Sequence, residues 1–303
     1  MSKPRPGERL WLDQPDARER AASTAPDPEI ARHALELIEH GYTVIRSGLT
    51  QAACQEALRS FEEWCTERPA DVASRRGANG YLPRLVNLHL VATPVARLFT
   101  TAERALAIQD FCFGYRTALY TSLFYERGSA QTSHRDIPYF RTEPIGFYFG
   151  MWVALEPIEA DNGPLFVIDR GHRIPYVDPH SIGAKRFAAG EPIPSISLEL
   201  WRDYQNQVAS LCAEAGLGTT KLLLDRGDVV LWHPLAPHGG AAIADPHRTR
   251  LSIVFHTTPE GVPVYQGDVF FDRSASPAPE PSWSYRELDG RKIADLSGGA
   301  HFG

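Results

Sequence analysis

Apolar residues recur at the spacing of an amphipathic helix in three stretches of the chain. The first is 28–40, where Asp27 stands at the N-cap, a proline opens the helix and Gly41 ends it. The second is about 50–67, and the third is 197–216, with leucine, tryptophan, tyrosine and valine on one stripe. The pattern predicts a helical beginning of the chain and one further helix in its second half.

A different pattern starts near residue 117, where short runs rich in β-branched and aromatic residues alternate with Gly, Asp and Pro. Many short strands without intervening helices favour an antiparallel sandwich or jelly roll over a parallel sheet. The predicted fold class is therefore mainly β with flanking helices. A first short strand is expected at 42–46, and the later ones at 117–125, 145–156, 164–168, 219–224, 228–233, 250–257 and 267–271.

These patterns divide the chain into one folded domain with two loose ends. Residues 1–27, rich in Pro, Arg and Asp, predict a flexible N-terminal arm, and 273–303, which begins with a proline-rich run, predicts a surface tail. Between them, residues 28–272 are predicted to form a single domain. Its helices are expected within 28–110, and its β core within 117–272.

One long insertion, about 173–218, interrupts the β core and contains the third predicted helix. A helix-bearing excursion of this length from a β framework usually lies over an opening. We therefore expect it to serve as a lid or pocket wall.

Composition narrows the class of protein. With 303 residues, 43% hydrophobic and 22% charged, the chain is long enough to bury a sizeable core. It shows no apolar run near the ~20 residues that cross a bilayer and no secretion signal at its start, so a cytoplasmic location is expected. The net charge of -6 disfavours a nucleic-acid partner and leaves a small molecule as the expected one. The scattered cysteines, Cys54, Cys65, Cys112 and Cys212, indicate neither disulfides nor a zinc site.

The first candidate chemistry lies in 131-QTSHRDIPYF-140, at the end of a predicted strand. Residues two apart in an extended segment point to the same side, so His134 and Asp136 are able to face one metal ion. The alternative is a loop histidine hydrogen-bonded to a neighbouring aspartate.

A third ligand is available in 227-GDVVLWHPLAPHGG-240, which contains His233 and His238. Two histidines and one carboxylate hold one side of an octahedral ion and leave three positions open, which suits Fe(II) that must bind a bidentate cosubstrate and dioxygen. We predict His238, because the following Gly239-Gly240 lets the backbone bend close to the ion. His233, inside the predicted strand, is the alternative, and it is otherwise a packed strand histidine.

A bidentate oxoacid needs a partner for its far carboxylate, and the planar fork of arginine suits it best. Arg250 begins the strand that follows, and Ser252 shares its face, so the pair is predicted to grip one carboxylate. Arg248 is the runner-up. Either arginine would otherwise be a solvated surface residue.

The order of these blocks resembles a known family. An H-R-D run, then 152-WVALEPIEADNGPLFVIDRGH-172, then 227-GDVVLWHPLAPHGG-240, then R-x-S is similar to the phytanoyl-CoA dioxygenase-like branch of the Fe(II)/2-oxoglutarate oxygenases. The resemblance covers about 41–271. The stretch 238-HGGAAIADPHRTR-250 departs from the family's H-x-S-x-x-N-x-S, which leaves the register of the arginine open but not the metal ligands.

The resemblance implies a double-stranded β-helix, a cupin-like jelly roll, with helices packed outside. It also implies Fe(II) held by His134, Asp136 and His238, with 2-oxoglutarate and O2 as cosubstrates. Arg250, with Trp152 beside it, is implied to bind 2-oxoglutarate. The expected reaction is hydroxylation of an unactivated carbon with release of succinate and CO2. Desaturation, epoxidation and cyclisation remain open from the same site.

The substrate is expected to be a small organic molecule, either a natural product or an amino-acid-derived acid. Two rivals remain: a cupin-like metal enzyme that uses no keto acid, and a binding protein that keeps the fold without turnover. For residues that could line the mouth of the site, the alternative is packing in the core or hydrogen bonding to loops. The candidates for substrate contact are Asn87, His89, Tyr139, Arg141 and Tyr148.

Overall fold

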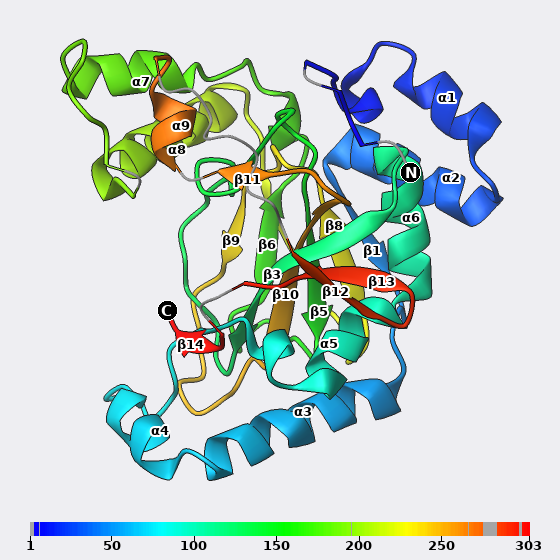
Figure 1. Cartoon of the computed structure of the whole chain (residues 1–303), viewed down its shortest axis with the longest axis vertical. Helices are drawn as coiled ribbons and strands as arrows, with labels where there is room; N and C mark the ends of the chain where they lie inside the picture. Colours follow the sequence, from blue (N-terminus) through cyan, green and yellow to red (C-terminus); the bar gives the residue numbers. More distant parts are fainter. Residues whose placement is uncertain (1–2, 6, 195, 266, 275–283, 297–298) are drawn as a thin grey trace.

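The computed structural model places a large sheet at the centre of the molecule, with helices on one side and a smaller sheet on the other (Figure 1). Within the part of the chain that the structure describes, no helix has the length and apolar character that a bilayer crossing requires. The structure describes residues 3–5, 7–194, 196–265, 267–274, 284–296 and 299–303.

The large sheet runs in the order β1-β8-β5-β10-β3-β13-β12, and its pairs are antiparallel except for β13 with β3. At its edge β2 pairs with β3, and β14 pairs with β2. The strands are β1 (Tyr42–Ile45), β2 (Leu85–Val86), β3 (Thr117–Tyr125), β5 (Phe149–Ala154), β8 (Val229–Trp232), β10 (Ser252–Pro259), β12 (Tyr285–Leu288), β13 (Arg291–Ala294) and β14 (His301–Phe302).

The smaller sheet has the order β7-β6-β9, and a two-stranded ribbon pairs β11 with β4. Together the sheets make the predicted jelly-roll core, although they do not close into a barrel. These strands are β4 (Arg141–Thr142), β6 (Leu165–Ile168), β7 (Thr219–Lys221), β9 (His238–Gly240) and β11 (Val264–Tyr265).

Helices pack on the outer face of the large sheet and form the main hydrophobic core with it. The strand period of two separates the faces: Val153 and Phe255 point into this core, whereas Trp152 and Val254 point to the side of the smaller sheet. The helices before β3 are α1 (Ala17–Thr24), α2 (Pro28–His40), α3 (Gln51–Thr66), α4 (Pro69–Arg75), α5 (Thr93–Thr100) and α6 (Glu103–Phe113), with 3-10 turns at Trp11–Asp13 and Leu88–Leu90.

The three predicted helices are confirmed, and their ends follow from local chemistry. Asp27 caps α2 by accepting from the amide of Ile30 at 2.8 Å, and Gly41 ends it at φ 82°, which favours glycine. The insertion holds α7 (Pro179–Arg186) and α8 (Leu198–Glu214), preceded by a 3-10 turn at Gly171–Arg173. With α9 (Gly267–Phe271) they bury a separate apolar cluster beside the sheets.

The expectation of a flexible N-terminal arm over residues 1–27 is wrong for most of that segment. Leu10, Trp11 and Leu12 are buried in the main core, and α1 packs on α2. The indole of Trp11 lies edge-on against Phe111 and donates its N–H to the carbonyl of that residue at 3.2 Å. Burial of these large apolar side chains holds the segment in place.

The C-terminal prediction also needs correction. Within 273–303, β12 and β13 form a hairpin on β3, and β14 extends the sheet beside β2. An Asp289-Gly290 turn with φ of 49° and 73° joins the hairpin, which is the turn chemistry such a connection favours. Most of the proline-rich part of the predicted tail, 275–283, lies outside the described residues.

The strand predicted at 267–271 is instead the short helix α9. Phe270 and Phe271 pack edge-on against Tyr204 of α8. The apolar run is therefore buried against a helix and not in a sheet, a choice that the run by itself does not reveal.

Candidate metal centre

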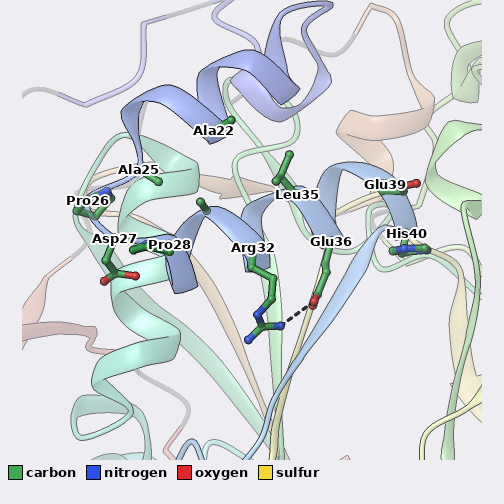
Figure 2. A pocket seen from close by; sticks show the side chains of 11 residues that line it. Ala22, Ala25, Pro26, Asp27, Pro28, Arg32, Leu35, Glu36, Glu39 and His40 are labelled. Carbon is green, nitrogen blue, oxygen red and sulfur yellow. Dashed lines mark hydrogen bonds and ion pairs between the residues drawn. The ribbon is translucent and has the colours of Figure 1, made fainter.

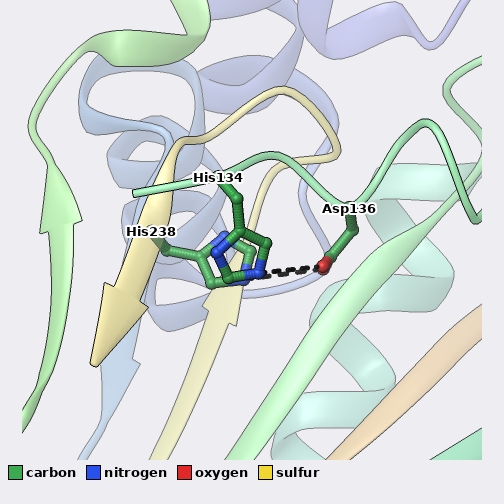
Figure 3. A group of neighbouring side chains, drawn as sticks. All are labelled: His134, Asp136 and His238. Atoms are coloured by element: carbon green, nitrogen blue, oxygen red, sulfur yellow. Dashed lines mark ion pairs between the residues drawn. The ribbon is translucent and has the colours of Figure 1, made fainter. Parts of the chain in front are cut away.

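Three side chains from two distant parts of the chain converge between the sheets (Figure 3). Among the described residues, His134, Asp136 and His238 are the group of His, Cys, Asp or Glu side chains whose ligand atoms all lie within 4.8 Å of one another. Nε2 of each histidine lies 3.6 Å from a carboxylate oxygen of Asp136. We call these residues the triad.

The backbone holds the two histidines face to face. The amide of His134 donates to the carbonyl of His238 at 2.9 Å, and the reverse bond has the same length. Gly239 and Gly240 matter for this pairing, because a Cβ on Gly239 would lie 2.5 Å from the carbonyl oxygen of Gln131. The glycines thus let the segment before His134 cross β9, which differs from the bend toward the ion expected from the sequence.

Both histidines have a defined tautomer. Nδ1 of His134 donates to the carbonyl of Thr132 at 3.0 Å, and Nδ1 of His238 donates to the carbonyl of Ala236 at 3.1 Å. A carbonyl oxygen only accepts, so the proton is on Nδ1 and the lone pair of Nε2 faces the triad. Burial lowers the pKa of His134 to about 4, which keeps this ring neutral. This donor set fits a divalent metal ion.

Asp136 is oriented by two donors on one of its oxygens. Oδ2 accepts from the hydroxyl of Tyr148 at 2.7 Å and from Nε1 of Trp232 at 3.2 Å. Burial alone would raise the pKa of Asp136, but the neighbouring histidines and the Tyr148 hydrogen bond lower it to about 2. Tyr148 therefore supports Asp136. It was predicted to contact substrate, but it is 1% exposed and does not line the cavity.

Gly150 makes room for the indole that holds Asp136. A Cβ at this position would lie 2.0 Å from Cε2 of Trp232. The small residue therefore leaves space for a tryptophan of the neighbouring strand β8.

Helix α8 forms hydrogen bonds with the backbone of Arg135, which lies between the triad residues His134 and Asp136. Oε1 of Gln205 accepts from the amide of Arg135 at 2.8 Å, and Nε2 of Gln205 donates to the Arg135 carbonyl at 2.9 Å. These paired bonds fix the peptide that joins His134 to Asp136 and link the predicted lid to the site.

The triad lines a cavity of about 620 Å³, a size typical of small-molecule sites. Its walls come from β2, β3, the large sheet, β6, β9, the segment 196–201 and residues near the C-terminus. Several aromatic side chains line these walls: Tyr120, Tyr125, Tyr139, Phe140, Trp152, Trp201 and Trp232.

Arg250 projects into this cavity as a buried cation. It is 2% exposed and donates through Nη1 to the carbonyl of Gly163 at 3.2 Å, while its Nε has no hydrogen-bond partner among the described residues. The rings of Tyr125 and Trp152 lie 5.7 and 5.6 Å from the guanidinium. Burial lowers its pKa to about 10, so it stays charged at neutral pH.

The runner-up arginine lies elsewhere. Arg248 is ion-paired with Glu159 and Asp161 near the surface and does not line the cavity. Ser252 is fully buried and its hydroxyl donates to the carbonyl of Arg250 at 3.4 Å, so it does not reach the cavity either.

Comparison with known proteins places the chain in a family. Residues 37–250 match the family described as Phytanoyl-CoA dioxygenase (PhyH). The chain belongs to this family. The peroxisomal phytanoyl-CoA dioxygenase of Bos taurus is 24% identical over 218 residues, which is 66% of this chain. The match spans about 60% of the length of that relative.

Solved structures show the same fold. The epimerase SnoN, in complex with Fe3+, alpha ketoglutarate and nogalamycin RO, superposes with a TM-score of 0.58 at 16% identity and covers 88% of this chain and 99% of its own. EctD from S. alaskensis, with 2-oxoglutarate and 5-hydroxyectoine, has a TM-score of 0.58 at 17% identity and covers 90% and 92%.

The remaining candidates for substrate contact divide into two groups. Tyr139 and Asn87 line the cavity, although Oδ1 of Asn87 already accepts from Thr121. His89 and Arg141, also predicted to contact substrate, do not line it. His89 bonds Ser122 at 2.7 Å in a fully buried position, and Arg141 pairs with Glu143 at 3.2 Å.

The alternative metal ligand also has another role. His233 is 1% exposed, and its Nε2 lies 3.1 Å from Asp13 of the N-terminal segment, away from the triad. Among the cavity residues that the sequence reasoning missed is His256, which the strand period signals. His256 follows Val254 of β10 and the preceding Arg250 at even steps, which puts it on the inner face.

A second hollow of similar volume lies on the surface between α1 and α2 (Figure 2). This groove holds about 590 Å³ and is lined by Arg32, Glu36 and His40 among others. Its charges already have partners: Arg32 pairs with Glu36 at 2.7 Å, and His40 pairs with Asp169 at 2.8 Å. The groove therefore presents no set of converging free donors or acceptors.

Proposed function

We propose that the protein is a non-haem Fe(II)/2-oxoglutarate-dependent dioxygenase. The observation that carries this proposal is a buried two-histidine, one-carboxylate triad whose open side faces a cavity that also holds a buried arginine. Family membership supports it, and iron and 2-oxoglutarate are ligands of fold relatives.

In this proposal His134 and His238 each hold the ion through Nε2, and Asp136 holds it through a carboxylate oxygen. Fe(II), when bound, supplies a centre at which dioxygen and 2-oxoglutarate are converted to succinate and CO2 while the substrate is oxidised. Hydrogen bonds from Tyr148 and Trp232 hold the carboxylate of Asp136 in place beside the ion. The aromatic walls keep water away from the reacting groups.

Arg250 binds the far carboxylate of 2-oxoglutarate. A buried guanidinium with an unused N–H is costly without an anionic partner, and the keto acid supplies one. This feature also favours the keto acid over a cupin-like reaction without it, and a reactive cosubstrate site over mere binding, because neither rival requires a buried cation in the cavity.

The finer proposal is hydroxylation of an unactivated carbon in a small organic molecule, such as a natural product or an amino-acid-derived acid. Asp136 supports this finer proposal. Its carboxylate is held by two hydrogen-bond donors, so the ion keeps all three protein ligands. Desaturation, epoxidation or cyclisation would use the same site. The cytoplasmic location stays a prediction.

An anaerobic titration tests the proposal. Fe(II) and 2-oxoglutarate together are expected to produce the weak visible absorption of a chelated keto acid. Arg250→Ala is expected to weaken 2-oxoglutarate binding about 10- to 100-fold, because it removes charge-assisted hydrogen bonds. Arg248→Ala is the matched control and should change the dissociation constant less than about twofold. No absorption from the native chain would refute the proposal.

A further inference from the structure

A buried histidine that the proposed chemistry does not use lies in the cavity wall. His256 is 2% exposed, sits opposite Gly150 in the register of β10 and β5, and lines the same cavity as the triad. The ring of Phe140 stacks on it, with centroids 4.2 Å apart and an interplanar angle of 19°. The stacking fixes the plane of the imidazole.

The hydrogen-bond chain behind His256 decides which nitrogen carries its proton. The hydroxyl of Tyr148 donates its single proton to the carboxylate of Asp136, which only accepts. The oxygen of Tyr148 must then accept from its other close partner, Nδ1 of His256. His256 therefore carries its proton on Nδ1.

Nε2 of His256 is thus a lone-pair acceptor. It has no hydrogen-bond partner among the described residues, and burial lowers the pKa of the ring to about 4, so it does not take up a second proton near neutral pH. A buried acceptor without a partner is costly, and native structures rarely keep one. A bound molecule is the natural source of the missing donor.

The segment from Arg250 into β10 carries an unused donor and an unused acceptor. Nε of Arg250 and Nε2 of His256 both lack a partner within the described residues, and the two positions are six residues apart on one face. Their Cα atoms are therefore separated by roughly 20 Å along the strand. A keto acid held at Arg250 leaves the acceptor at His256 free for the substrate.

The walls near His256 indicate the rest of the molecule. Phe140 stacks on it, and Tyr120 lies edge-on to Phe140 at 6.2 Å. Across the triad, Trp201 lies 6.0 Å from His134, and the rim residue Leu198 is 58% exposed. Aromatic walls with an apolar rim suit a ring.

Resting on the proposed function, we propose that Nε2 of His256 accepts a hydrogen bond from a hydroxyl or N–H group of the substrate. The substrate class is then a ring-bearing alcohol, phenol or amine. An acid or ether without such a donor is disfavoured, because it would place one lone pair against another.

Two substitutions separate this role from support of Asp136. In His256→Asn the amide N–H reaches the place of Nδ1, so the bond to Tyr148 is kept and the acceptor in the cavity is lost. In His256→Gln the amide oxygen reaches the place of Nε2, so the acceptor is kept and the bond to Tyr148 is lost. A purely structural role predicts that the Gln variant is the more impaired in every measurement.

The experiment uses the full chain loaded with Zn(II) and 2-oxoglutarate, with phenol and anisole as probes that differ by the hydroxyl proton. Nitrogen-15 spectra of labelled histidine report the tautomer of His256 and the binding of each probe. We expect the Nδ1–H tautomer, and phenol binding about fivefold tighter than anisole. The preference should persist in the Gln variant and disappear in the Asn variant.

Each other outcome overturns the inference. An Nε2–H tautomer, equal binding of both probes, or no binding of phenol to the native chain would do so without any variant. A phenol preference that persists in His256→Asn would also overturn it. Failure of the proposed function is recognised separately, because the Fe(II) titration would then show no absorption whatever the probes do.

Discussion

The cavity at the triad and the groove between α1 and α2 have nearly the same volume, about 620 and 590 Å³, yet they differ in the state of their polar groups. In the groove Arg32, Glu36 and His40 are satisfied by one another or by close neighbours. In the cavity Arg250 and His256 keep unused hydrogen-bonding atoms within the described structure. Unsatisfied, converging groups mark a binding site better than volume does.

The largest expected effect is on metal affinity, and it distinguishes the cavity from the groove. His238→Ala removes one of three protein ligands and should weaken Co(II) binding at least about 100-fold, because ligand count dominates affinity. His40→Ala, at the groove, should leave the affinity unchanged, since His40 pairs with Asp169 and neither residue lines the cavity of the triad. Metal titrations followed by absorption measure both. An equal loss of metal affinity in the two variants would contradict the distinction between cavity and groove.

A smaller effect is expected from Gly150→Ala. The new methyl group would overlap the indole of Trp232 and push its N–H away from Asp136. We expect metal affinity to fall about tenfold, as for other groups that orient ligands. Gly218→Ala is the control, because a Cβ there meets nothing within 4 Å. Unchanged affinity in the Gly150 variant would show that the indole does not position Asp136.

The hydrogen bonds from Gln205 of α8 to the Arg135 backbone give a third test. Gln205→Leu removes both bonds to the Arg135 peptide and should lower metal affinity about three- to tenfold by loosening the link between His134 and Asp136. Gln207→Leu changes an exposed amide on the same helix. Calorimetric metal titration compares them. If the two variants bind metal equally well, α8 covers the site without holding it.

The smallest effect concerns stability at the groove. Burial alone would raise the pKa of Glu36, but hydrogen bonds from His33, Thr43 and Arg32 outweigh it and lower the pKa from 4.5 to about 2. Its stabilising contribution is therefore present above pH 4.5 and is lost as pH falls toward 2. Glu36→Gln should flatten this part of the unfolding free energy against pH, measured with urea. If the unfolding free energy of the variant depends on pH as it does in the native chain, the stabilising contribution of Glu36 is contradicted.

Much of the fold was predictable because its signals are local. Helix caps such as Asp27 and Thr50 act within three residues, and the strand period shows in runs of a few residues. The two ends were mistaken because Trp11 and Ile293 owe their burial to partners far along the chain. The apolar run 267–271 was mistaken because burial against α8 and burial in a sheet require the same composition.

The candidate site was also predictable only where its signals are local. The spacing of His134 and Asp136 is visible in three letters of sequence, and Arg250 and His256 lie an even number of residues apart, as the strand period requires. The partners of Tyr148 and Gln205 are not visible, because each bonds a residue on another element. The Asp289-Gly290 turn was a readable hairpin signal that the proline-rich context obscured.

By itself the sequence determined which side chains carry chemistry and which faces of helices and strands they occupy, since both depend on neighbours a few positions away. Only the tertiary structure decided that His238 and not His233 meets His134, that Arg250 and not Arg248 enters the cavity, and that His256 keeps a free lone pair. These choices depend on strand order and register, and those follow from how the whole chain buries its apolar surface.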